Sequence, residues 1–409
     1  MSLPSQNGFE ALASGAVVSP FTRLKALLAP HASEVAETID LTLGEPRETM
    51  PPFIAAKVVE AEALFAKYPA IRGSEPLRAA IAGWLGRRFG LEGAGAVDPE
   101  REVLPTLGSR EGLYFAAIPA VGRRSFSGRP AILIVNPFYQ AYFGAALATA
   151  AEPVFLNATA RSGHLPDLDD IASRPDLLAR TAALYLCSPA NPQGAVADAD
   201  YIRRALELAR AHDFMLFLDE CYSEIYASAP PVGGLSVAAA TPARFRNLVV
   251  FNSLSKRSNL PGLRSGFCAG DGEFLSALAE VRNLVGPTMA GPIQHASASA
   301  WSDEAHVAMN RDAYQAKFDV ADRLLAGRFG YERPAGGFFL WLDVSQLGGG
   351  VQASVTIWKR CGVRVIPGAY LAQPGLDGTN PGADYVRVAL VADPATIGRA
   401  LERIVSLVA

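Results

Sequence analysis

Cysteine is scarce in this sequence, and the few cysteines lie far apart. Four of the 409 residues are cysteines, and none belongs to a CxxC pair or lies beside a histidine cluster. Disulfide frameworks and zinc sites use closely spaced ligands, so neither a disulfide nor a metal site is expected. We expect reduced thiols in a cytoplasmic protein, most of them buried and structural. These residues are Cys187, Cys221, Cys268 and Cys361.

The chain also lacks long apolar runs and any block of one charge. No stretch of about 18 uninterrupted apolar residues is present to span a bilayer. Residues 1–10 are polar, without a basic start or an apolar segment, so a signal peptide is not expected. The 37 basic and 40 acidic side chains leave a formal net charge of −3. Neither a membrane nor a nucleic acid is indicated as a partner.

What the sequence does contain is apolar residues and enough length for more than one core. Hydrophobic residues make up 50% of the chain and charged residues 19%, which predicts a well-buried protein. A chain of 409 residues exceeds what one ordinary core supports, so two domains are expected.

The middle of the sequence repeats a short apolar run, a polar turn and a helical pattern. The runs are apolar on both faces, as in a parallel sheet covered by helices on both sides. Residues 200–212 place Ile202, Ala205, Leu206 and Ala209 on one helical face, which is typical of a crossover helix. The alternation predicts an α/β domain whose ligands bind after the strands. The apolar runs are residues 103–106, 131–135, 183–187, 214–218 and 248–251.

The ends of the chain follow a different pattern. Residues 336–341 and 385–390 are strand-like, and residues 21–28 form a helical pattern that can pack with them. We expect a smaller α+β domain built from both termini. The predicted division gives residues 47–290 to the large domain and residues 1–46 and 291–409 to the small one.

Residues 253–266 carry the most informative pattern. Lys256 follows a buried run, where burial and cationic neighbours favour a neutral amine that can form an imine with an aldehyde. Ser253 and Ser255 can donate hydrogen bonds to a phosphate, and Arg264 can grip two phosphate oxygens. A lysine that binds aldehydes beside a phosphate cradle describes a pyridoxal 5'-phosphate (PLP) site. A surface turn with ordinary charges is the alternative.

At this segment the sequence resembles the class I and II aminotransferases of PLP fold type I, along nearly the whole chain. Six blocks of the family occur in order: residues 43–46, 68–73, 108–111, 188–194, 219–222 and Arg387. The resemblance implies a large domain with a mostly parallel, seven-stranded sheet between helices, and a smaller α+β domain. It also implies PLP as the cofactor, small amino acids and 2-oxo acids as substrates, and a homodimer with active sites at the interface.

The resemblance assigns further residues to the cofactor and the substrate. Gly44 lies on the loop that contacts substrate, and Tyr68 reaches the phosphate of the neighbouring subunit. Ser109 and Arg110 form the phosphate-binding turn at a helix start, where backbone N–H groups face an anion; a helix cap by Ser109 is equally compatible. Tyr139 is expected to stack on the pyridine ring, with Phe138 and Tyr142 as competitors for that place.

The remaining matches concern the ring and the substrate carboxylate. Asp219 ends an apolar run, where a protonated pyridine nitrogen would compensate its charge; a helix cap is the alternative. Asn191 and Tyr222 can both hydrogen-bond the ring's phenolic oxygen, although Asn191-Pro192 is also a turn signal. Arg387 lies among apolar neighbours and needs an anion, either a substrate carboxylate or a structural carboxylate.

The implied reaction is transamination, with Arg387 and Asn191 as anchors of the substrate and Lys256 as cofactor tether, general base and general acid. Residues 136–140, 219–226, 253–266 and 301–307 resemble the bacterial N-succinyldiaminopimelate aminotransferases of lysine biosynthesis. That resemblance implies glutamate and N-succinyl-2-amino-6-oxopimelate as substrates. Another class I aminotransferase and a PLP-dependent carbon–sulfur lyase stay open as alternatives.

The sequence departs from this subfamily at Ser19, Gly337 and residues 283–288, which leaves the acyl specificity open. The anchor of the distal carboxylate is also open, with three arginines as candidates: Arg23, Arg110 and Arg257. A PLP-fold domain of a transcription regulator is disfavoured, because too few residues precede the body of the chain for a DNA-binding domain.

Overall fold

The structure is a computed structural model that describes residues 17–408. Its largest sheet has seven strands, and all of them are parallel except β8, which pairs antiparallel with both neighbours. The expected mostly parallel, seven-stranded sheet is therefore confirmed. In spatial order the strands are β2 (Val103–Thr106), β8 (Gly266–Gly270), β7 (Leu248–Ser253), β6 (Met215–Asp219), β5 (Thr181–Cys187), β3 (Ala131–Asn136) and β4 (Glu152–Asn157).

Helices cover both faces of this sheet, so every strand residue from β2 to β8 apart from the ends of β4 is buried. One apolar core lies between the sheet and α4 (Glu75–Phe89), α8 (Leu168–Ala172), α9 (Pro175–Arg180), α10 (Ala199–Ala211), α11 (Gly234–Ala239) and α14 (Gly291–Ser302). A second core lies between the opposite face and α5 (Ser109–Phe115), α6 (Ala117–Gly122), α7 (Gln140–Ala148) and α13 (Gly272–Val285). The buried face of α10 is the one predicted from its spacing.

A smaller assembly contains the C-terminal part of the chain and the N-terminal segment. Strands β11 (Ile366–Pro367), β12 (Tyr385–Ala389) and β9 (Phe339–Asp343) form an antiparallel sheet with β12 in the middle. Strand β1 (Ile39–Asp40) pairs in parallel with β10 (Val363–Arg364), so the N-terminal segment does join this assembly. Its helices are α2 (Pro20–Leu28), α16 (Gly349–Cys361) and α17 (Pro394–Val405), together with the end of α15.

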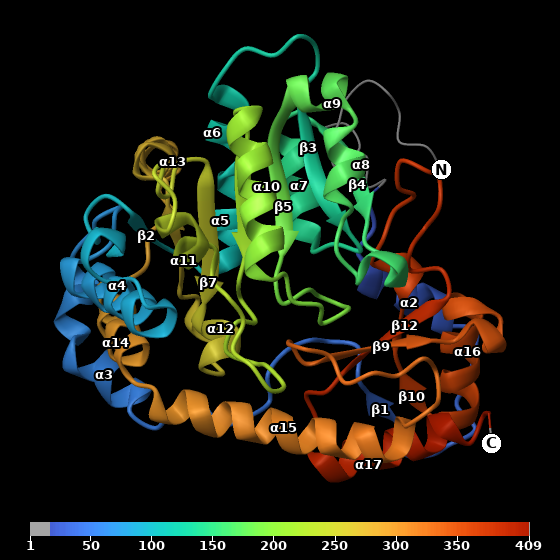
Figure 1. Cartoon of the computed structure of the whole chain (residues 1–409). Coiled ribbons are helices and arrows are strands. Elements are labelled where there is room, and N and C mark those ends of the chain that lie inside the picture. Colours follow the sequence, from blue (N-terminus) through green and yellow to red (C-terminus); the bar gives the residue numbers. More distant parts are fainter. Residues whose placement is uncertain (1–16, 409) are drawn as a thin grey trace.

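Helix α15 (Ala305–Leu325) is the longest helix and runs along the lower edge of the molecule beneath both assemblies (Figure 1). Its last two turns bury Phe318, Ala321 and Leu325 in the core of the smaller assembly. The preceding helix α14 instead packs on α4 and on α3 (Ile54–Glu60), and its Trp301 belongs to the core of the large sheet. We therefore propose that the large domain extends to the end of α14 rather than to residue 290.

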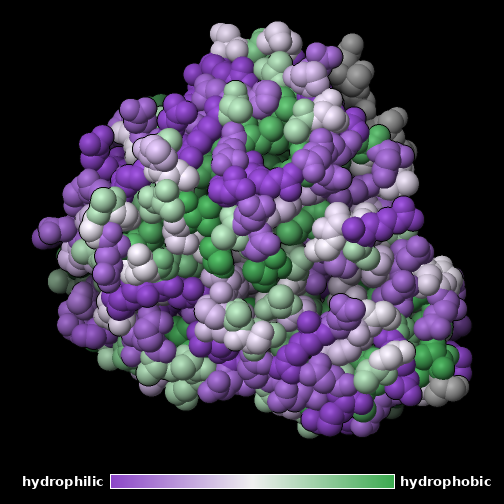
Figure 2. Space-filling model, in the orientation of Figure 1, coloured by the Kyte–Doolittle hydropathy of each residue, from purple (hydrophilic) through white to green (hydrophobic). Residues whose placement is uncertain are grey.

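The cysteines and the surface can be compared with the expectations from the sequence. All four cysteines are free and buried, as expected. Within residues 17–408 no helix is long and apolar enough to cross a bilayer. Residues 1–10, for which no signal peptide was expected, lie outside the described residues. Figure 2 shows hydrophilic residues over most of one face, with hydrophobic residues in small separate patches.

Candidate active site

Several of the predicted site residues lie at one edge of the large sheet, because its parallel strands end there. Ser109 begins the helix after β2, Asn191 follows β5, and Asp219 is the last residue of β6. Lys256 lies in the short helix α12 (Leu254–Arg257), directly after β7. Arg264 precedes the antiparallel β8 and so lies at the same edge. Parallel α/β sheets place their ligand sites at this edge.

The amine of Lys256 lies in a half-buried position without a carboxylate in hydrogen-bonding contact. Its Nζ donates a hydrogen bond of 2.5 Å to the carbonyl oxygen of Gly44 and lies 5.3 Å from the centre of the Phe338 ring. Burial is the main cause that lowers the pKa of Lys256 to about 8, with nearby Arg387 acting in the same direction. At a pKa of about 8, about one tenth of this amine is neutral at pH 7, far more than for a lysine with the ordinary pKa, and the neutral form is the one that a nucleophile or base requires.

Asp219 is a buried carboxylate whose hydrogen-bonding partners are both neutral. Its Oδ2 accepts from the Tyr142 hydroxyl at 2.7 Å, and its Oδ1 accepts from the Cys221 backbone N–H at 3.1 Å. Burial raises the pKa of Asp219, which means that the surroundings do not fully compensate the negative charge. The alternative of a helix cap does not apply, because a turn rather than a helix follows Asp219. A cationic ring N–H would complete this site.

Arg387 is the positive counterpart, buried in the middle of β12. Its Nη1 donates to Asn191 Oδ1 at 3.2 Å and its Nη2 to the carbonyl oxygen of Thr42 at 2.7 Å. Its Nε is buried without a partner, and the guanidinium lies 4.4 Å from the centre of the Phe339 ring. No carboxylate of the described residues neutralises Arg387, so the alternative of a structural ion pair is not what the structure contains.

The side chains of the expected phosphate cradle are close together. Ser253 Oγ lies 2.8 Å from Ser255 Oγ and accepts from the Ser255 backbone N–H, so the two hydroxyls form one polar corner. Arg264 donates to the carbonyl oxygens of Pro261 and Leu107, which fixes its guanidinium against the turn before α5.

Gly108 permits this arrangement. It has a φ of +76°, and a Cβ at this position would lie 2.5 Å from Arg264 Nη2. Gly108, and not Ser109, caps helix α5, so the alternative role of Ser109 as the cap is not observed.

Of the three aromatic candidates for ring stacking, Tyr139 is the one that is accessible. Phe138 is buried against Phe143 and Phe155, and Tyr142 is stacked on Tyr185 with its hydroxyl on Asp219. Tyr139 is half-buried, and its hydroxyl accepts a 2.5 Å hydrogen bond from Arg110 Nε. The arrangement therefore favours Tyr139.

Tyr222 and Gly44 both lie against the rings of Phe338 and Phe339. The Tyr222 ring packs edge-on against Phe338 and Phe339, at centroid distances of 5.3 and 5.9 Å. A Cβ on Gly44 would lie 2.5 Å from the Phe339 ring, so only glycine lets the 43–46 loop approach this closely. The roles of Gly44 and Tyr222 toward substrate and cofactor stay predictions.

Tyr68 makes no contribution to the site of its own chain. Its side chain is fully exposed, in a stretch that also exposes the apolar side chains of Val59, Leu64 and Phe65. This exposure is what a residue that serves a neighbouring subunit would show.

The structure removes one of the three candidates for a distal carboxylate anchor. Arg257 is fully buried, its guanidinium lies 5.4 and 5.0 Å from the centres of the Trp84 and Trp301 rings, and it pairs with Glu304 at 2.8 Å. It cannot reach a substrate. Arg23, which lies over the Tyr370 ring, and Arg110 stay candidates.

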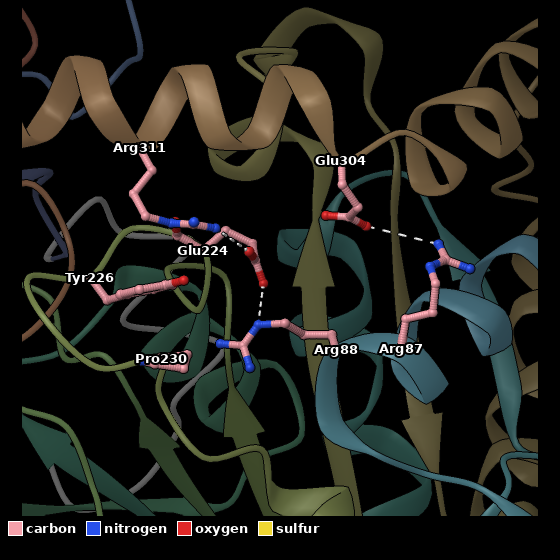
Figure 3. Close-up of a pocket in the computed structure, with 7 residues that line it drawn as sticks. All are labelled: Arg87, Arg88, Glu224, Tyr226, Pro230, Glu304 and Arg311. Carbon is pink, nitrogen blue, oxygen red and sulfur yellow. Dashed lines mark hydrogen bonds and ion pairs between the residues drawn. The ribbon is translucent and has the colours of Figure 1, made fainter.

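A separate depression of about 300 Å³ lies between α4, the start of α15 and the loop after β6 (Figure 3). Arg88 and Arg311 share the buried carboxylate of Glu224, at 2.7 and 3.0 Å, and Arg87 lies 3.8 Å from Glu304. None of the predicted site residues lines this depression. Its arginines are engaged by protein carboxylates, in contrast to Arg387.

Sequence reasoning did not foresee two contributors to the site. Tyr142 was considered only for ring stacking, but it is the hydrogen-bond donor to Asp219; its position one helical turn after Tyr139 was the available signal. The Thr42 carbonyl, which orients Arg387, has no sequence signal, because any residue supplies a backbone oxygen.

Comparison with known proteins identifies the family. Residues 36–404 match the family model described as aminotransferase class I and II. An LL-diaminopimelate aminotransferase of Syntrophobacter fumaroxidans is 28% identical over 94% of both chains, and the 4-dedimethylamino-4-oxo-anhydrotetracycline transaminase OxyQ of Streptomyces rimosus is 31% identical over 90% of this chain and 92% of its own. An aminotransferase structure from Neisseria meningitidis superimposes with a TM-score of 0.90, at 39% identity over 96% of this chain and 98% of that one.

The site fits the cofactor of this family. A buried carboxylate without a cation suits the protonated pyridine nitrogen of PLP, an amine of lowered pKa suits its aldehyde, and the hydroxyls with Arg264 suit its phosphate. Aminotransferases of classes I and II are PLP-dependent. The chain therefore belongs to the class I and II aminotransferase family and is a PLP-dependent transaminase.

Proposed function

We propose that this transaminase exchanges an amino group between glutamate and N-succinyl-2-amino-6-oxopimelate, in lysine and diaminopimelate biosynthesis. One observation carries the assignment of an amino acid and a 2-oxo acid as substrates: the guanidinium of Arg387 has no carboxylate partner among the described residues. It contacts Asn191 and lies close enough to Lys256 to lower the pKa of that amine. The residue strings at 219–226, 253–266 and 301–307 support the succinylated substrate.

In the proposed reaction, bound PLP supplies the electron sink that makes the substrate α-proton acidic. Arg387 binds the substrate carboxylate with two N–H donors, and Asn191 orients that guanidinium. Lys256 Nζ would remove the proton from the substrate α-carbon and deliver it to the carbon that was the aldehyde carbon of the cofactor, and its lowered pKa suits both steps. The Gly44 carbonyl oxygen holds the amine in place between the two transfers. Asp219 holds the ring nitrogen protonated.

The remaining predicted roles complete this proposal. Ser109, Arg110, Ser253, Ser255 and Arg264 bind the phosphate. Tyr139 stacks on the ring, and Asn191 with Tyr222 hydrogen-bonds the phenolic oxygen. Lys256 is the catalytic residue.

A half-reaction screen tests the substrate. The visible absorbance of the bound cofactor is followed after adding glutamate, N-succinyl-LL-diaminopimelate or free LL-diaminopimelate, each without a 2-oxo acid. We expect the visible absorbance to fall quickly with glutamate and with the succinylated compound. Loss with free LL-diaminopimelate alone would contradict the succinyl assignment.

LL-diaminopimelate is the second candidate, because several relatives that match over 90% or more of both chains carry the name LL-diaminopimelate aminotransferase. A carbon–sulfur lyase would instead release pyruvate and ammonia from a cysteine conjugate when no amino acceptor is present.

We further propose a cytoplasmic homodimer whose active sites each include Tyr68 of the other subunit. The full exposure of Tyr68 supports the dimer, and the four free thiols support a reducing compartment. A mixing experiment tests the shared site. The variants Lys256→Ala and Tyr68→Ala, each expected to be inactive alone, are mixed, and transaminase activity is measured after their subunits have exchanged.

In the mixed dimer of this experiment one of the two sites pairs an intact Lys256 with an intact Tyr68. We expect about a quarter of wild-type activity when subunits exchange at random. If Tyr68 served its own chain, no site in the mixture would be intact, and activity would stay at the level of the single variants.

A further inference from the structure

One face of α15 is buried although it carries polar and charged residues. Asn310, Tyr314 and Lys317 are spaced by four and three residues, so they lie on one side of the helix. Their exposed fractions are 5%, 1% and 1%. Lysine and asparagine are rarely buried this deeply without specific partners, so the contacts of this face are informative.

Asn310 contacts the main chain of the catalytic turn. Its Nδ2 donates to the carbonyl oxygen of Lys256 at 3.0 Å and to that of Arg257 at 3.4 Å. These carbonyls end the four-residue helix α12, where helical partners are missing. The Asn310 side chain thus fixes the backbone from which the Lys256 side chain extends.

Tyr314 supports the aromatic ring near the Lys256 amine. It stacks on Phe338 at a centroid distance of 5.1 Å and an interplanar angle of 15°. Phe338 in turn lies 5.3 Å from Lys256 Nζ. The Tyr314 hydroxyl is buried without a partner, so the ring and not the hydroxyl makes the contact.

Lys317 holds the loop that supplies the hydrogen-bond acceptor of Lys256. Its Nζ pairs with Glu48 at 2.5 Å and lies 4.6 Å from the centre of the Tyr314 ring. Glu48 is four residues after Gly44, whose carbonyl oxygen accepts from Lys256 Nζ.

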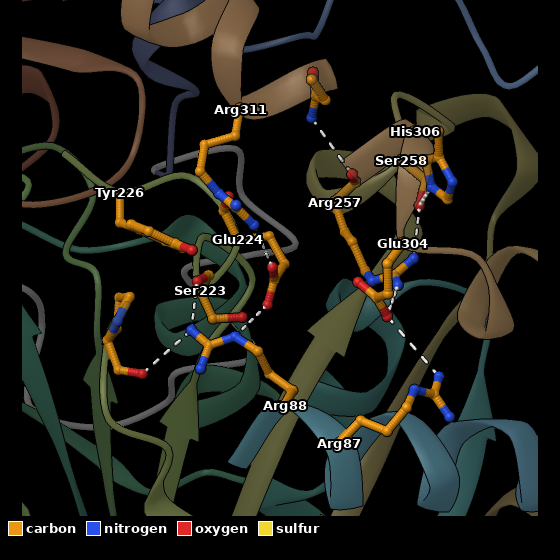
Figure 4. Close-up of polar contacts among 12 residues, drawn as sticks. Arg87, Arg88, Ser223, Glu224, Tyr226, Arg257, Ser258, Glu304, His306 and Arg311 are labelled. Atoms are coloured by element: carbon orange, nitrogen blue, oxygen red, sulfur yellow. Dashed lines mark hydrogen bonds and ion pairs between the residues drawn. The ribbon is translucent and has the colours of Figure 1, made fainter. Parts of the chain in front are cut away.

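The start of α15 is tied to the same turn (Figure 4). His306 Nε2 lies 2.8 Å from Ser258 Oγ, and its Nδ1 lies 2.5 Å from Asp303. Arg257 pairs with Glu304, the residue before the helix. The helix is therefore fixed to the Lys256 turn at its beginning and packs in the smaller core at its end.

We propose that Asn310, Tyr314 and Lys317 are positioning residues for Lys256, which together hold its main chain, the ring beside its amine and the loop that accepts its hydrogen bond. The inference rests on the proposed role of Lys256. None of the three touches the cofactor or substrate in this proposal; each acts through another group.

The three residues should affect the pKa of Lys256, because the face they form keeps its amine away from water. Burial is the largest cause of its lowered pKa, while Cys221, Arg387, Glu45 and Arg110 are the charged or titratable groups that act on it. Loosening the surrounding face admits water and raises the pKa. A rise from about 8 to about 9 would lower the neutral fraction at pH 7 about tenfold.

The test is trace acetylation of the full chain between pH 6 and 10, with the modification of Lys256 read by peptide mass spectrometry. Asn310→Ala and Lys317→Met are compared with wild type, and Lys317→Arg should restore the wild-type profile. Asp322→Asn is the matched control, because it breaks an ion pair of the same helix with Arg333, remote from the Lys256 contacts.

We expect both test variants to reduce Lys256 acetylation at pH 7 about tenfold and to move its midpoint upward, with the control unchanged. Unmoved profiles in Asn310→Ala and Lys317→Met, with only a lower unfolding temperature, would overturn the proposal and leave a purely structural role. A separate measurement asks whether added PLP protects Lys256 of the wild-type chain from acetylation. Lack of protection refutes the proposed function and not the positioning.

Discussion

Arg387→Met separates the binding role of Arg387 from a role in folding. Methionine has a similar length and no charge, so it fills much of the same space in β12. The change removes a guanidinium that is 5% exposed and has no carboxylate partner among the described residues. A structural arginine and a substrate-binding arginine predict opposite outcomes for stability.

The magnitude follows from the structure. Burial lowers the pKa of Arg387 to about 10 from its ordinary 12.5, which corresponds to about 3 kcal/mol of penalty on the charged form. Methionine removes that penalty but leaves the Thr42 carbonyl and the Asn191 side chain short of one donor each, at about 1–3 kcal/mol apiece. The two effects oppose each other, so we expect the free energy of unfolding to change by no more than about 3 kcal/mol.

The effect on catalysis is expected to be much larger. Two charge-assisted hydrogen bonds to a carboxylate contribute about 1.5–3 kcal/mol each, so kcat/KM should fall by about two to four orders of magnitude. Arg387→Lys keeps the charge but loses the two-pronged geometry, and it should lie between wild type and Arg387→Met.

Urea unfolding and steady-state kinetics on the same preparations measure both quantities. Loss of more than about 4 kcal/mol of stability, together with the loss of activity, would refute the reasoning, because it would show that the guanidinium is needed by the fold. Unchanged kcat/KM would refute the assignment of the substrate carboxylate to Arg387.

Two further predictions concern the cofactor contacts. Asp219→Asn keeps an acceptor for Tyr142 but cannot hold the ring nitrogen protonated; kcat should fall at least about 100-fold without loss of thermal stability, and a wild-type kcat would contradict the role. Gly108→Ala places a Cβ 2.5 Å from Arg264 Nη2 at a φ of +76°. PLP affinity, measured by titrating the cofactor-free protein, should fall at least about tenfold, and unchanged affinity would remove Arg264 from the phosphate site.

The sequence predicted the large sheet well because its strands are buried on both faces. An apolar run of four or five residues that ends in a polar turn has few other interpretations, and all five predicted runs are strands of one sheet. The sequence did not predict the two remaining strands of this sheet, β4 and β8. The antiparallel direction of β8 follows from the tight turn through Arg264, which the sequence shows only as glycine and proline around an arginine.

The candidate site could be predicted where a residue's chemistry is unusual for its surroundings, and not where an ordinary residue helps. Lys256, Asp219 and Arg387 stand out because they interrupt or end apolar runs. Tyr142 and Asn310 do not stand out, because a tyrosine and an asparagine in a helix fit many roles. Their partners are 77 and 54 residues away along the chain, and only the fold brings them together.

The pairing of buried charges distinguishes the residues kept for a ligand from those that serve the fold. Most buried aspartate, glutamate, lysine and arginine side chains of the described residues have an opposite charge in contact: Arg78, Glu224, Arg257, Arg282 and Lys317. Glu220 has none, but burial raises its pKa to about 8, so it is largely neutral at pH 7.

Like Glu220, Asp219 and Arg387 have no opposite charge in contact within residues 17–408. Each is buried, each has neutral hydrogen-bonding partners, and Arg387 stays charged at any physiological pH because its pKa is about 10. Burying such charges without compensation costs stability, so they persist only where something outside the chain completes them. The same criterion separates Arg257 from Arg387: both are buried arginines in family motifs, but Glu304 already neutralises Arg257. We therefore propose that the substrate carboxylate binds at Arg387 and that the distal end of the substrate is anchored by another residue.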